Sequence, residues 1–212
     1  MIKVFIIDDH HVVRRGLKQI LSDEKDIEVV GEASSSEEFI EQPLIKPWDI
    51  LVLDITMPGR NGLDALIEVK SKNPGSKILI LSMHSDEEVV IRALRTGANG
   101  YLTKDSAPEE LVKAIRQIYK GKKYIGTSIT SKAMSDLTNG NGEEPHKKLS
   151  NREFQVFCLL ASGNSLAKIA DDLSISIKTV STYRTRIMEK VNLKTNIELV
   201  HYALKYKLVI PL

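Results

Sequence analysis

Hydrophobic positions in the first 120 residues fall into five short runs. Most of these runs are continuous rather than alternating and are rich in Val, Ile and Leu. Continuous runs of this kind are typical of strands that are covered on both faces of a parallel sheet. Glu28 interrupts the second run, as expected of an edge strand. The predicted strands are residues 4–7, 27–30, 50–53, 78–81 and 100–102.

A stretch with helical periodicity follows each predicted strand. These stretches have roughly the length that βα units need. The predicted helices are residues 12–21, 37–42, 63–72, 87–96 and 108–119. Five βα pairs within residues 1–121 predict one doubly wound (βα)5 domain of the α/β class.

The pattern changes after Gly121. Residues 122–148 cluster Gly, Asn and Pro with few apolar anchors, which predicts a linker, with one short helix at residues 131–137. Residues 149–212 have helical periodicity and predict an all-α domain. Ser150 with Glu153, and Thr195 with Glu198, fit the capping box of a helix start. The predicted helices are residues 151–162, 166–173, 177–190 and 196–207.

The composition of the whole chain is ordinary, but the net charge differs between the two predicted domains. The 212 residues are 42% hydrophobic and 27% charged, which is typical of a soluble globular protein and excludes a disordered chain or a coiled-coil rod. The net charge of +2 indicates no partner. Residues 146–212, however, hold eleven basic and five acidic residues, a net charge of +6, whereas residues 1–125 carry −2. A basic helical domain favours nucleic acid as its partner.

Several sequence features bear on localisation. The single cysteine, Cys158, excludes an intrachain disulfide, so we expect a reducing compartment. The apolar run at the N-terminus reaches Asp8 and Asp9 too soon for a signal peptide. No run of about 18 apolar residues is present, so we expect no membrane span and a cytoplasmic protein.

Polar residues follow the predicted strands at their carboxyl ends. They are Asp8 and Asp9 after the first, Asp54 after the third, Ser82 after the fourth and Lys104 after the fifth. Such residues converge at one edge of a parallel sheet. Three neighbouring carboxylates require a cation, and oxygen ligands suit Mg²⁺. An Asp carboxylate can accept a phosphoryl group, whose oxygens a lysine and a hydroxyl would bind. The histidines His10, His11, His146 and His201 show no metal-ligand spacing.

Two enzyme classes compete with this interpretation. Phosphohydrolases with an Asp nucleophile use a second Asp two residues later as acid and base, but this chain has Thr56 there. A dinucleotide-binding domain is disfavoured because no Gly-x-Gly-x-x-Gly motif follows the first strand.

The second and third helices of the basic domain are joined by the short turn 174–176. This spacing predicts a helix-turn-helix. The third helix directs Val180, Ile187 and Val191 to the core. Its other face is basic and hydroxyl-rich, which suits the major groove of double-stranded DNA. That face carries Lys178, Thr179, Ser181, Thr182, Arg184, Thr185 and Arg186.

The first 120 residues resemble the receiver domain of two-component response regulators. The motifs that carry the resemblance are Asp8-Asp9, Asp54 with Met57-Pro58-Gly59 and Gly62, Ser82, and Tyr101-Leu-Thr-Lys104. The resemblance implies that a histidine kinase phosphorylates Asp54. It also implies that Asp8, Asp9, Asp54 and the backbone carbonyl of Thr56 bind Mg²⁺, that Ser82 and Lys104 contact the phosphoryl group, and that Tyr101 is the coupled switch residue. Such a domain assists only its own phosphotransfer and dephosphorylation, so we do not expect an enzyme.

Residues 149–208 resemble the LuxR/FixJ-type DNA-binding domain. The matching residues are Leu149-Ser-Asn-Arg-Glu153, Gly163, Ile169-Ala170, Leu173 with Ser176, and Lys178-Thr-Val180. By this resemblance Ser181, Thr182 and Thr185 face bases, and Lys178, Thr179, Tyr183, Arg184 and Arg186 face phosphates or the groove edge. The last helix would form the dimer contact through Leu199, Val200, Ala203 and Tyr206. Tyr183 replaces a common His, which is similar to the GacA/UvrY and BvgA/EvgA branches.

Together these features predict a response regulator and transcription factor of the NarL/FixJ family. Phosphorylation of Asp54 would free the recognition helix, promote homodimerisation and control sequence-specific DNA binding. The alternative is a receiver-like module whose DNA binding does not depend on phosphorylation.

Overall fold

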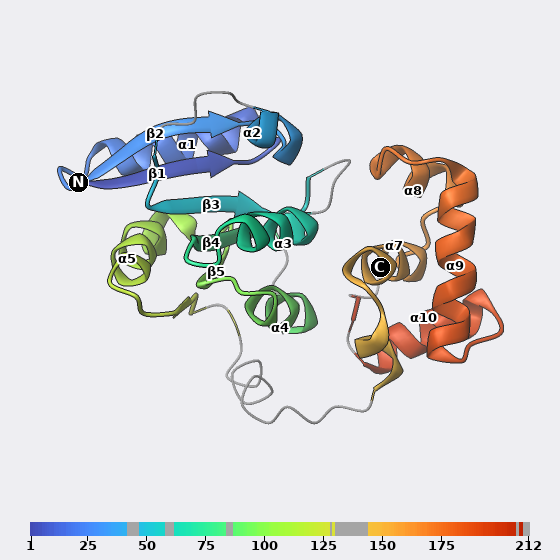
Figure 1. Ribbon diagram of the computed structural model, residues 1–212. Coiled ribbons are helices and arrows are strands. Elements are labelled where there is room, and N and C mark those ends of the chain that lie inside the picture. Colours follow the sequence, from blue (N-terminus) through green and yellow to red (C-terminus); the bar gives the residue numbers. More distant parts are fainter. Residues whose placement is uncertain are drawn as a thin grey trace.

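The computed structural model describes residues 1–41, 47–57, 62–83, 87–127, 129, 144–206 and 208–209. It has an α/β part and a helical part, which lie side by side in Figure 1. The predicted helix at residues 131–137 lies outside the described residues. None of the helices within the described ranges has the length and apolar character needed to cross a bilayer.

A six-stranded parallel sheet forms the centre of the α/β part, with the order β2-β1-β3-β4-β5-β6. Its strands are β1 Ile2–Ile7, β2 Ile27–Ala33, β3 Ile50–Asp54, β4 Lys77–Ser82, β5 Gly100–Thr103 and β6 Tyr124–Ile125. Every adjacent pair is parallel. The continuous apolar runs of β3 and β4 are buried on both faces, and Glu28 is exposed on the edge strand β2, as predicted.

Helices cover both faces of this sheet. They are α1 His11–Ser22, α2 Ser36–Glu41, α3 Gly62–Lys72, α4 Glu87–Arg95 and α5 Ala107–Tyr119. One hydrophobic cluster joins the sheet to α2, α3 and α4 through Phe39, Leu66 and Ile91. A second cluster joins the sheet to α1 and α5 through Leu21 and Leu111. The predicted doubly wound α/β fold is therefore confirmed.

The sixth strand, β6, lies in the segment predicted to be a linker. Tyr124 is buried, and its hydroxyl donates a 2.7 Å hydrogen bond to Oε2 of Glu110. Burial and the negative charge of Glu110 raise the pKa of Tyr124 to about 12. A strand of two residues has no periodicity to detect, so its pairing with β5 was missed in the sequence.

The helical part consists of a 3-10 helix and four α-helices. They are η1 Pro145–Lys148, α7 Asn151–Ala161, α8 Leu166–Asp172, α9 Ile177–Val191 and α10 Asn196–Lys205. Ser150 and Glu153 form the predicted capping box at the start of α7. Phe157, Val180 and Ile187 are fully buried in the common core of these helices. The four helices predicted for this region are confirmed.

Candidate functional site

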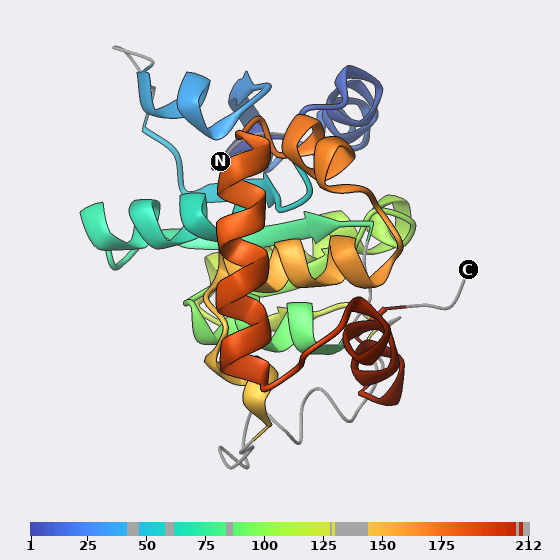
Figure 2. The same cartoon turned by 90° about the vertical axis from the view of Figure 1, so that its right-hand side faces the viewer.

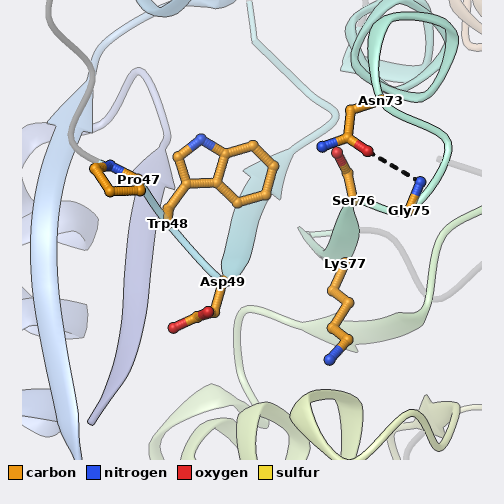
Figure 3. A pocket seen from close by; sticks show the side chains of 7 residues that line it. All are labelled: Pro47, Trp48, Asp49, Asn73, Gly75, Ser76 and Lys77. Carbon is orange, nitrogen blue, oxygen red and sulfur yellow. Dashed lines mark hydrogen bonds between the residues drawn. The ribbon is translucent and has the colours of Figure 1, made fainter.

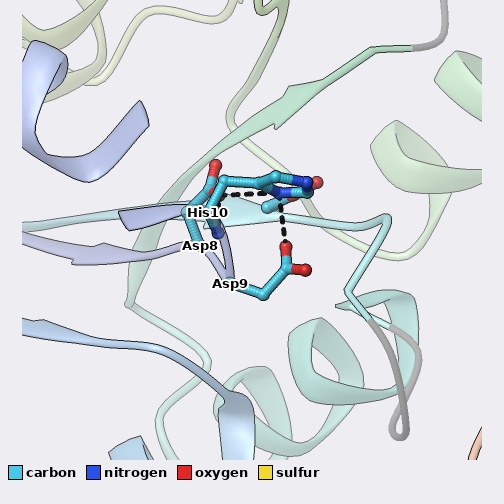
Figure 4. Close-up of side chains that lie close together, drawn as sticks. Asp8, Asp9 and His10 are labelled. Atoms are coloured by element: carbon cyan, nitrogen blue, oxygen red, sulfur yellow. Dashed lines mark hydrogen bonds and ion pairs between the residues drawn. The ribbon is translucent and has the colours of Figure 1, made fainter. Parts of the chain in front are cut away.

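Acidic side chains meet at the carboxyl edge of the sheet. Asp8 and Asp9 follow β1, and Asp54 ends the adjacent strand β3. The side chains of Asp8 and Asp54 are 1% and 0% exposed. Ligand atoms from these three acids and from His10 all lie within 4.8 Å of one another. Figure 4 shows Asp8, Asp9 and His10 grouped at this edge. The predicted convergence of the three acids is therefore present in the fold.

Lys104 lies between two of these carboxylates. Its Nζ is 2.7 Å from Oδ2 of Asp54 and 2.7 Å from Oδ2 of Asp8. Burial opposes the charge on Lys104, but hydrogen bonds to Asp54 and Asp8 outweigh it and hold the pKa of Lys104 above its usual value. Burial raises the pKa of Asp8; Lys104 opposes this effect, and repulsion from Asp54 adds to it. The site thus holds an ammonium group against the carboxylates at neutral pH.

The other oxygen of Asp54, Oδ1, accepts two hydrogen bonds from Thr56. The Thr56 amide lies at 2.8 Å and the Thr56 hydroxyl at 2.6 Å. Gly62 begins α3 against the same strand end, and a Cβ atom there would lie 2.4 Å from the backbone oxygen of Asp54. Only glycine lets α3 approach this closely. Pro58 and Gly59 of the same motif lie outside the described residues.

Ser82 and Tyr101 lie on the next two strands. Ser82 ends β4 and is fully buried, and its carbonyl oxygen accepts a 2.8 Å hydrogen bond from the amide of Lys104. Tyr101 on β5 is fully buried in the cluster that includes Val90 and Ile91 of α4. Both residues have the predicted positions, and their contact with a phosphoryl group stays a prediction.

The carboxylate and carbonyl oxygens at this edge suit a divalent cation that prefers oxygen ligands. Oδ1 of Asp9 is buried within the cluster, where it is placed to serve as a metal ligand. Carboxylate and carbonyl oxygens are the usual ligands of Mg²⁺. Nδ1 of His10 lies 2.8 Å from the same oxygen of Asp9. The spacing of the histidines gave no sign of this neighbour, which the turn after β1 brings into the cluster.

Arg14 supports the acidic loop and was missed in the sequence. Its Nη1 donates a 2.6 Å hydrogen bond to the backbone oxygen of Asp8, and its Nε donates to Glu32 on β2. Lys18 also donates to Glu32, at 2.7 Å. A basic residue on an amphipathic helix normally indicates a solvated face, so the pattern carried no signal for this role.

The second site is the exposed face of α9, which follows the turn after α8. Val180, Ile187 and Val191 are buried, as predicted. Figure 2 shows α9 in front of the rest of the molecule. The predicted DNA-facing side chains that are exposed on it are Lys178, Ser181, Thr182, Thr185 and Arg186.

Three of the predicted DNA-facing residues are half-buried. Thr179 lies at the helix start, where its amide donates to the Ser176 hydroxyl. Tyr183 packs against the domain core, and Nε of Arg184 donates a 3.0 Å hydrogen bond to Oδ1 of Asn196. These three side chains are therefore less available to DNA than their exposed neighbours.

The α9 face is accessible although the two parts of the chain are docked. Figure 1 shows α7 between the sheet and α9. Ser181, Thr182 and Thr185 are exposed in the whole chain, and an effect of phosphorylation on this helix stays a prediction.

The predicted dimer face of α10 mostly packs inside its own domain. Leu199 and Ala203 are 1% and 0% exposed, and Val200 is half-buried. The Tyr206 ring packs 4.5 Å from Tyr202, measured between ring centroids. A small domain needs this apolar stripe for its own core. Leu199 and Ala203 are therefore covered by their own domain, and a dimer contact through α10 stays a prediction.

A pocket of about 450 Å³ lies at the opposite edge of the sheet, where β3 and β4 begin. Figure 3 shows Trp48 and Asn73 on its walls. Oδ2 of Asp49 accepts a hydrogen bond from the Lys3 amide, so this carboxylate already has a structural role. The pocket is separate from the acidic cluster.

Two family models match the chain. Residues 4–116 match the response regulator receiver domain. Residues 147–203 match the luxR family of bacterial regulatory proteins.

Curated relatives and solved structures match nearly the whole chain. Oxygen regulatory protein NreC of Staphylococcus carnosus is 40% identical over 98% of this chain and 99% of its own. Response regulator UvrY of Escherichia coli is 37% identical, with 98% and 96% covered. A structure of RcsB from Salmonella enterica serovar Typhimurium, bound to promoter P1flhDC with the phosphomimetic BeF3−, is 28% identical. Its TM-score is 0.67, with 95% of this chain and 97% of that chain covered.

Proposed function

Because this chain belongs to the NarL/FixJ-type response regulators, which join a receiver domain to a LuxR-type DNA-binding domain, we propose that Asp54 is its phosphoacceptor and α9 its DNA-reading helix. The observation that carries the proposal is the setting of Asp54. This carboxylate is fully buried, 2.7 Å from the Lys104 ammonium and within the acidic cluster.

The proposed reaction transfers a phosphoryl group from a phosphohistidine of a cognate kinase. A carboxylate oxygen of Asp54 attacks phosphorus, the P–N bond breaks, and the imidazole nitrogen leaves with the bonding electrons. An acyl phosphate on Asp54 results. Mg²⁺ would neutralise charge on the phosphoryl oxygens, held by Asp8, Asp9, Asp54 and the backbone carbonyl of Thr56.

Two residues of the site act on the transferred group in this proposal. Lys104 is charged and lies beside Asp54, so its ammonium binds a phosphoryl oxygen after transfer. The Ser82 hydroxyl, at the end of the neighbouring strand, donates to another oxygen. Movement of Ser82 would bias Tyr101 and α4, which share one hydrophobic cluster.

The chain acts on double-stranded DNA in this proposal. The predicted base-facing residues Ser181, Thr182 and Thr185 are exposed, and Lys178 and Arg186 supply positive charge for phosphates. The active form is a homodimer. On α10, Ile197 and Leu204 are 72% and 39% exposed and offer an apolar contact that the buried Leu199 does not.

The proposal includes no diffusible substrate. The receiver assists only its own phosphotransfer and dephosphorylation, and the protein works in the cytoplasm. The proposed division of the chain is a receiver over residues 1–121, a linker over 122–148 and a DNA-binding domain over 149–212. Strand β6 and helix η1 lie inside that linker segment and pack against the two domains.

Labelling with acetyl phosphate and Mg²⁺ tests the phosphoacceptor. We expect the full chain to gain one phosphoryl group and Asp54→Asn to gain none. Asp49→Asn is the matched control, because Asp49 lies just before the other end of β3. Equal labelling of Asp54→Asn and wild type would reject the proposal.

One observation favours the second candidate, DNA binding that does not depend on phosphorylation. The α9 face is exposed while the two domains are docked. DNA affinity measured with and without phosphodonor separates the two functions. A higher affinity after phosphorylation supports phosphate control, and equal affinity supports the second candidate.

A further inference from the structure

Arg92 of α4 reaches across to the helical part of the chain. Its Nη2 donates a 2.6 Å hydrogen bond to the backbone oxygen of His146, and its Nη1 donates a 2.8 Å bond to that of Leu149. The guanidinium carbon lies 4.1 Å from the centre of the Phe154 ring on α7. One side chain of the receiver therefore makes one contact with η1 and two with the DNA-binding domain.

The carbonyl groups that Arg92 binds belong to η1 and the residue that follows it. The His146 oxygen also accepts a 3.2 Å hydrogen bond from the Leu149 amide, and backbone oxygens at the end of a helix carry partial negative charge. A planar guanidinium can bond two such oxygens at once, which an ammonium group does less well. Arg92 thus binds one backbone oxygen of η1 and one at the start of the DNA-binding domain, although more than 50 residues separate the partners.

Neighbouring residues of α4 bury Arg92 and add contacts with the helical part of the chain. Arg92 is 9% exposed, and its Nε bonds Oε1 of Glu88, one turn earlier on α4, at 2.9 Å. Oε2 of Glu88 lies 3.9 Å from Nε2 of His146. Val89 packs against both the receiver core and the core of the DNA-binding domain. The outer face of α4 is therefore covered by η1 and α7.

This docking covers α4 and leaves α9 free. Helix α9 lies on the far side of α7 from the sheet (Figure 1), and Ser181 and Thr185 are exposed on it. A clasp at this position fixes the direction in which α9 faces relative to the receiver. It does not block access to α9.

We propose that Arg92 is an interdomain clasp that holds the DNA-binding domain on α4 through the backbone oxygens of His146 and Leu149, and that it orients the recognition helix without masking it. The clasp lies on the helix that follows Ser82, so a shift of α4 would act on the orientation of α9. The proposal concerns the chain without a phosphoryl group, and its test uses no phosphodonor. Its outcome is therefore independent of phosphotransfer to Asp54.

Small-angle X-ray scattering of the full chain tests the clasp. We expect Arg92→Gln to increase the radius of gyration and to add a second maximum to the distance distribution, because the two domains separate. Arg95→Gln is the matched control, since Arg95 is an exposed arginine on the same helix, and it should keep the wild-type curve. A wild-type curve for Arg92→Gln would overturn the proposal.

The double variant Glu88→Gln with Arg92→Gln tests the clasp even if the single variant unfolds the receiver. It removes the acid that Arg92→Gln would leave buried and unpaired, so it preserves the receiver fold if the single variant does not. Circular dichroism checks that fold. Domain separation in the double variant supports the clasp, and a wild-type scattering curve overturns it.

Alkylation of a cysteine on α9 tests whether the docked receiver leaves the recognition helix accessible. Ser181→Cys is placed in a Cys158→Ser background and labelled with a maleimide. We expect Arg92→Gln to change the labelling rate by less than about twofold, because Ser181 is already accessible. An increase of about tenfold or more would show that docking protects α9 and would overturn this half of the proposal.

Discussion

The hydroxyl of Thr56 donates a 2.6 Å hydrogen bond to Oδ1 of Asp54. The Thr56 amide donates to the same oxygen, and Lys104 holds the other oxygen. Every carboxylate oxygen of the proposed phosphoacceptor is therefore engaged before phosphotransfer. Hydrogen bonds to a carboxylate stabilise its charged form and lower its reactivity as a nucleophile.

Thr56→Val removes the hydroxyl donor and keeps the amide donor. We expect phosphorylation by acetyl phosphate to become about fivefold faster, because one hydrogen bond contributes about 1 kcal/mol. Stopped-flow kinetics of the full chain measures the rate. Thr56→Ser retains the hydroxyl and should keep the wild-type rate. A slower rate in Thr56→Val would show that the hydroxyl assists transfer.

Gly62→Ala places a Cβ atom 2.4 Å from the backbone oxygen of Asp54. The backbone must shift, so we expect a loss of about 1–3 kcal/mol in the free energy of unfolding, measured with urea. Gly16→Ala is the control, because no atom lies within 4 Å of its added Cβ in α1. That control should gain about 0.5–1 kcal/mol from helix propensity. Equal effects of the two substitutions would contradict the close approach.

Lys104→Met removes the ammonium group between Asp54 and Asp8. The two carboxylates then repel each other without a buried cation, so we expect a loss of about 3–5 kcal/mol in the free energy of unfolding. Mg²⁺ should stabilise this variant more than wild type. Lys122→Met, at an exposed position just after α5, should change stability by less than about 0.5 kcal/mol. A variant as stable as wild type without Mg²⁺ would contradict the assigned ion pairs.

We expect His146, which packs on Tyr202 and Tyr206 of its own domain and faces Glu88 of α4, to make the docking of the two domains depend on pH. Burial and the positive charge of Arg92 lower the pKa of His146 to about 4, from an ordinary value of 6.5; Glu144 opposes this shift and Lys147 adds to it. Its other neighbours are Glu88 and the Tyr202 hydroxyl. Because docking favours neutral His146, its contribution is complete above pH 6.5 and is lost as the pH falls toward 4.

Scattering curves recorded between pH 7 and pH 4 check this dependence. We expect the radius of gyration of wild type to rise as the pH falls through this range. His146→Gln cannot take up a proton between pH 7 and pH 4, so its radius of gyration should rise less than that of wild type. The same pH profile in both proteins would assign the change to another group.

Local patterns predicted the sheet and the acidic cluster, because both follow from the order of strands. Continuous apolar runs indicate parallel strands, and residues after those strands meet at one edge. Asp8, Asp54 and Lys104 are therefore near one another by topology alone. The two-residue strand β6 has no such pattern, and its place depends on the burial of Tyr124.

Contacts between distant segments were not predictable in the same way. Arg92 lies on an amphipathic helix, where an arginine usually faces solvent, and its partners are backbone oxygens that no residue type reveals. Leu199 and Ala203 form a regular apolar stripe, but periodicity does not distinguish a domain core from a dimer contact.

The identity of the phosphorylated residue tests the central claim most directly. Borohydride reduces an aspartyl phosphate to homoserine, which marks the position for peptide mass spectrometry. After incubation with acetyl phosphate and Mg²⁺, we predict homoserine at position 54 of the full chain and at no other aspartate. Homoserine at position 8 or 9, or an unmodified Asp54 beside a phosphorylated residue elsewhere, would contradict the account.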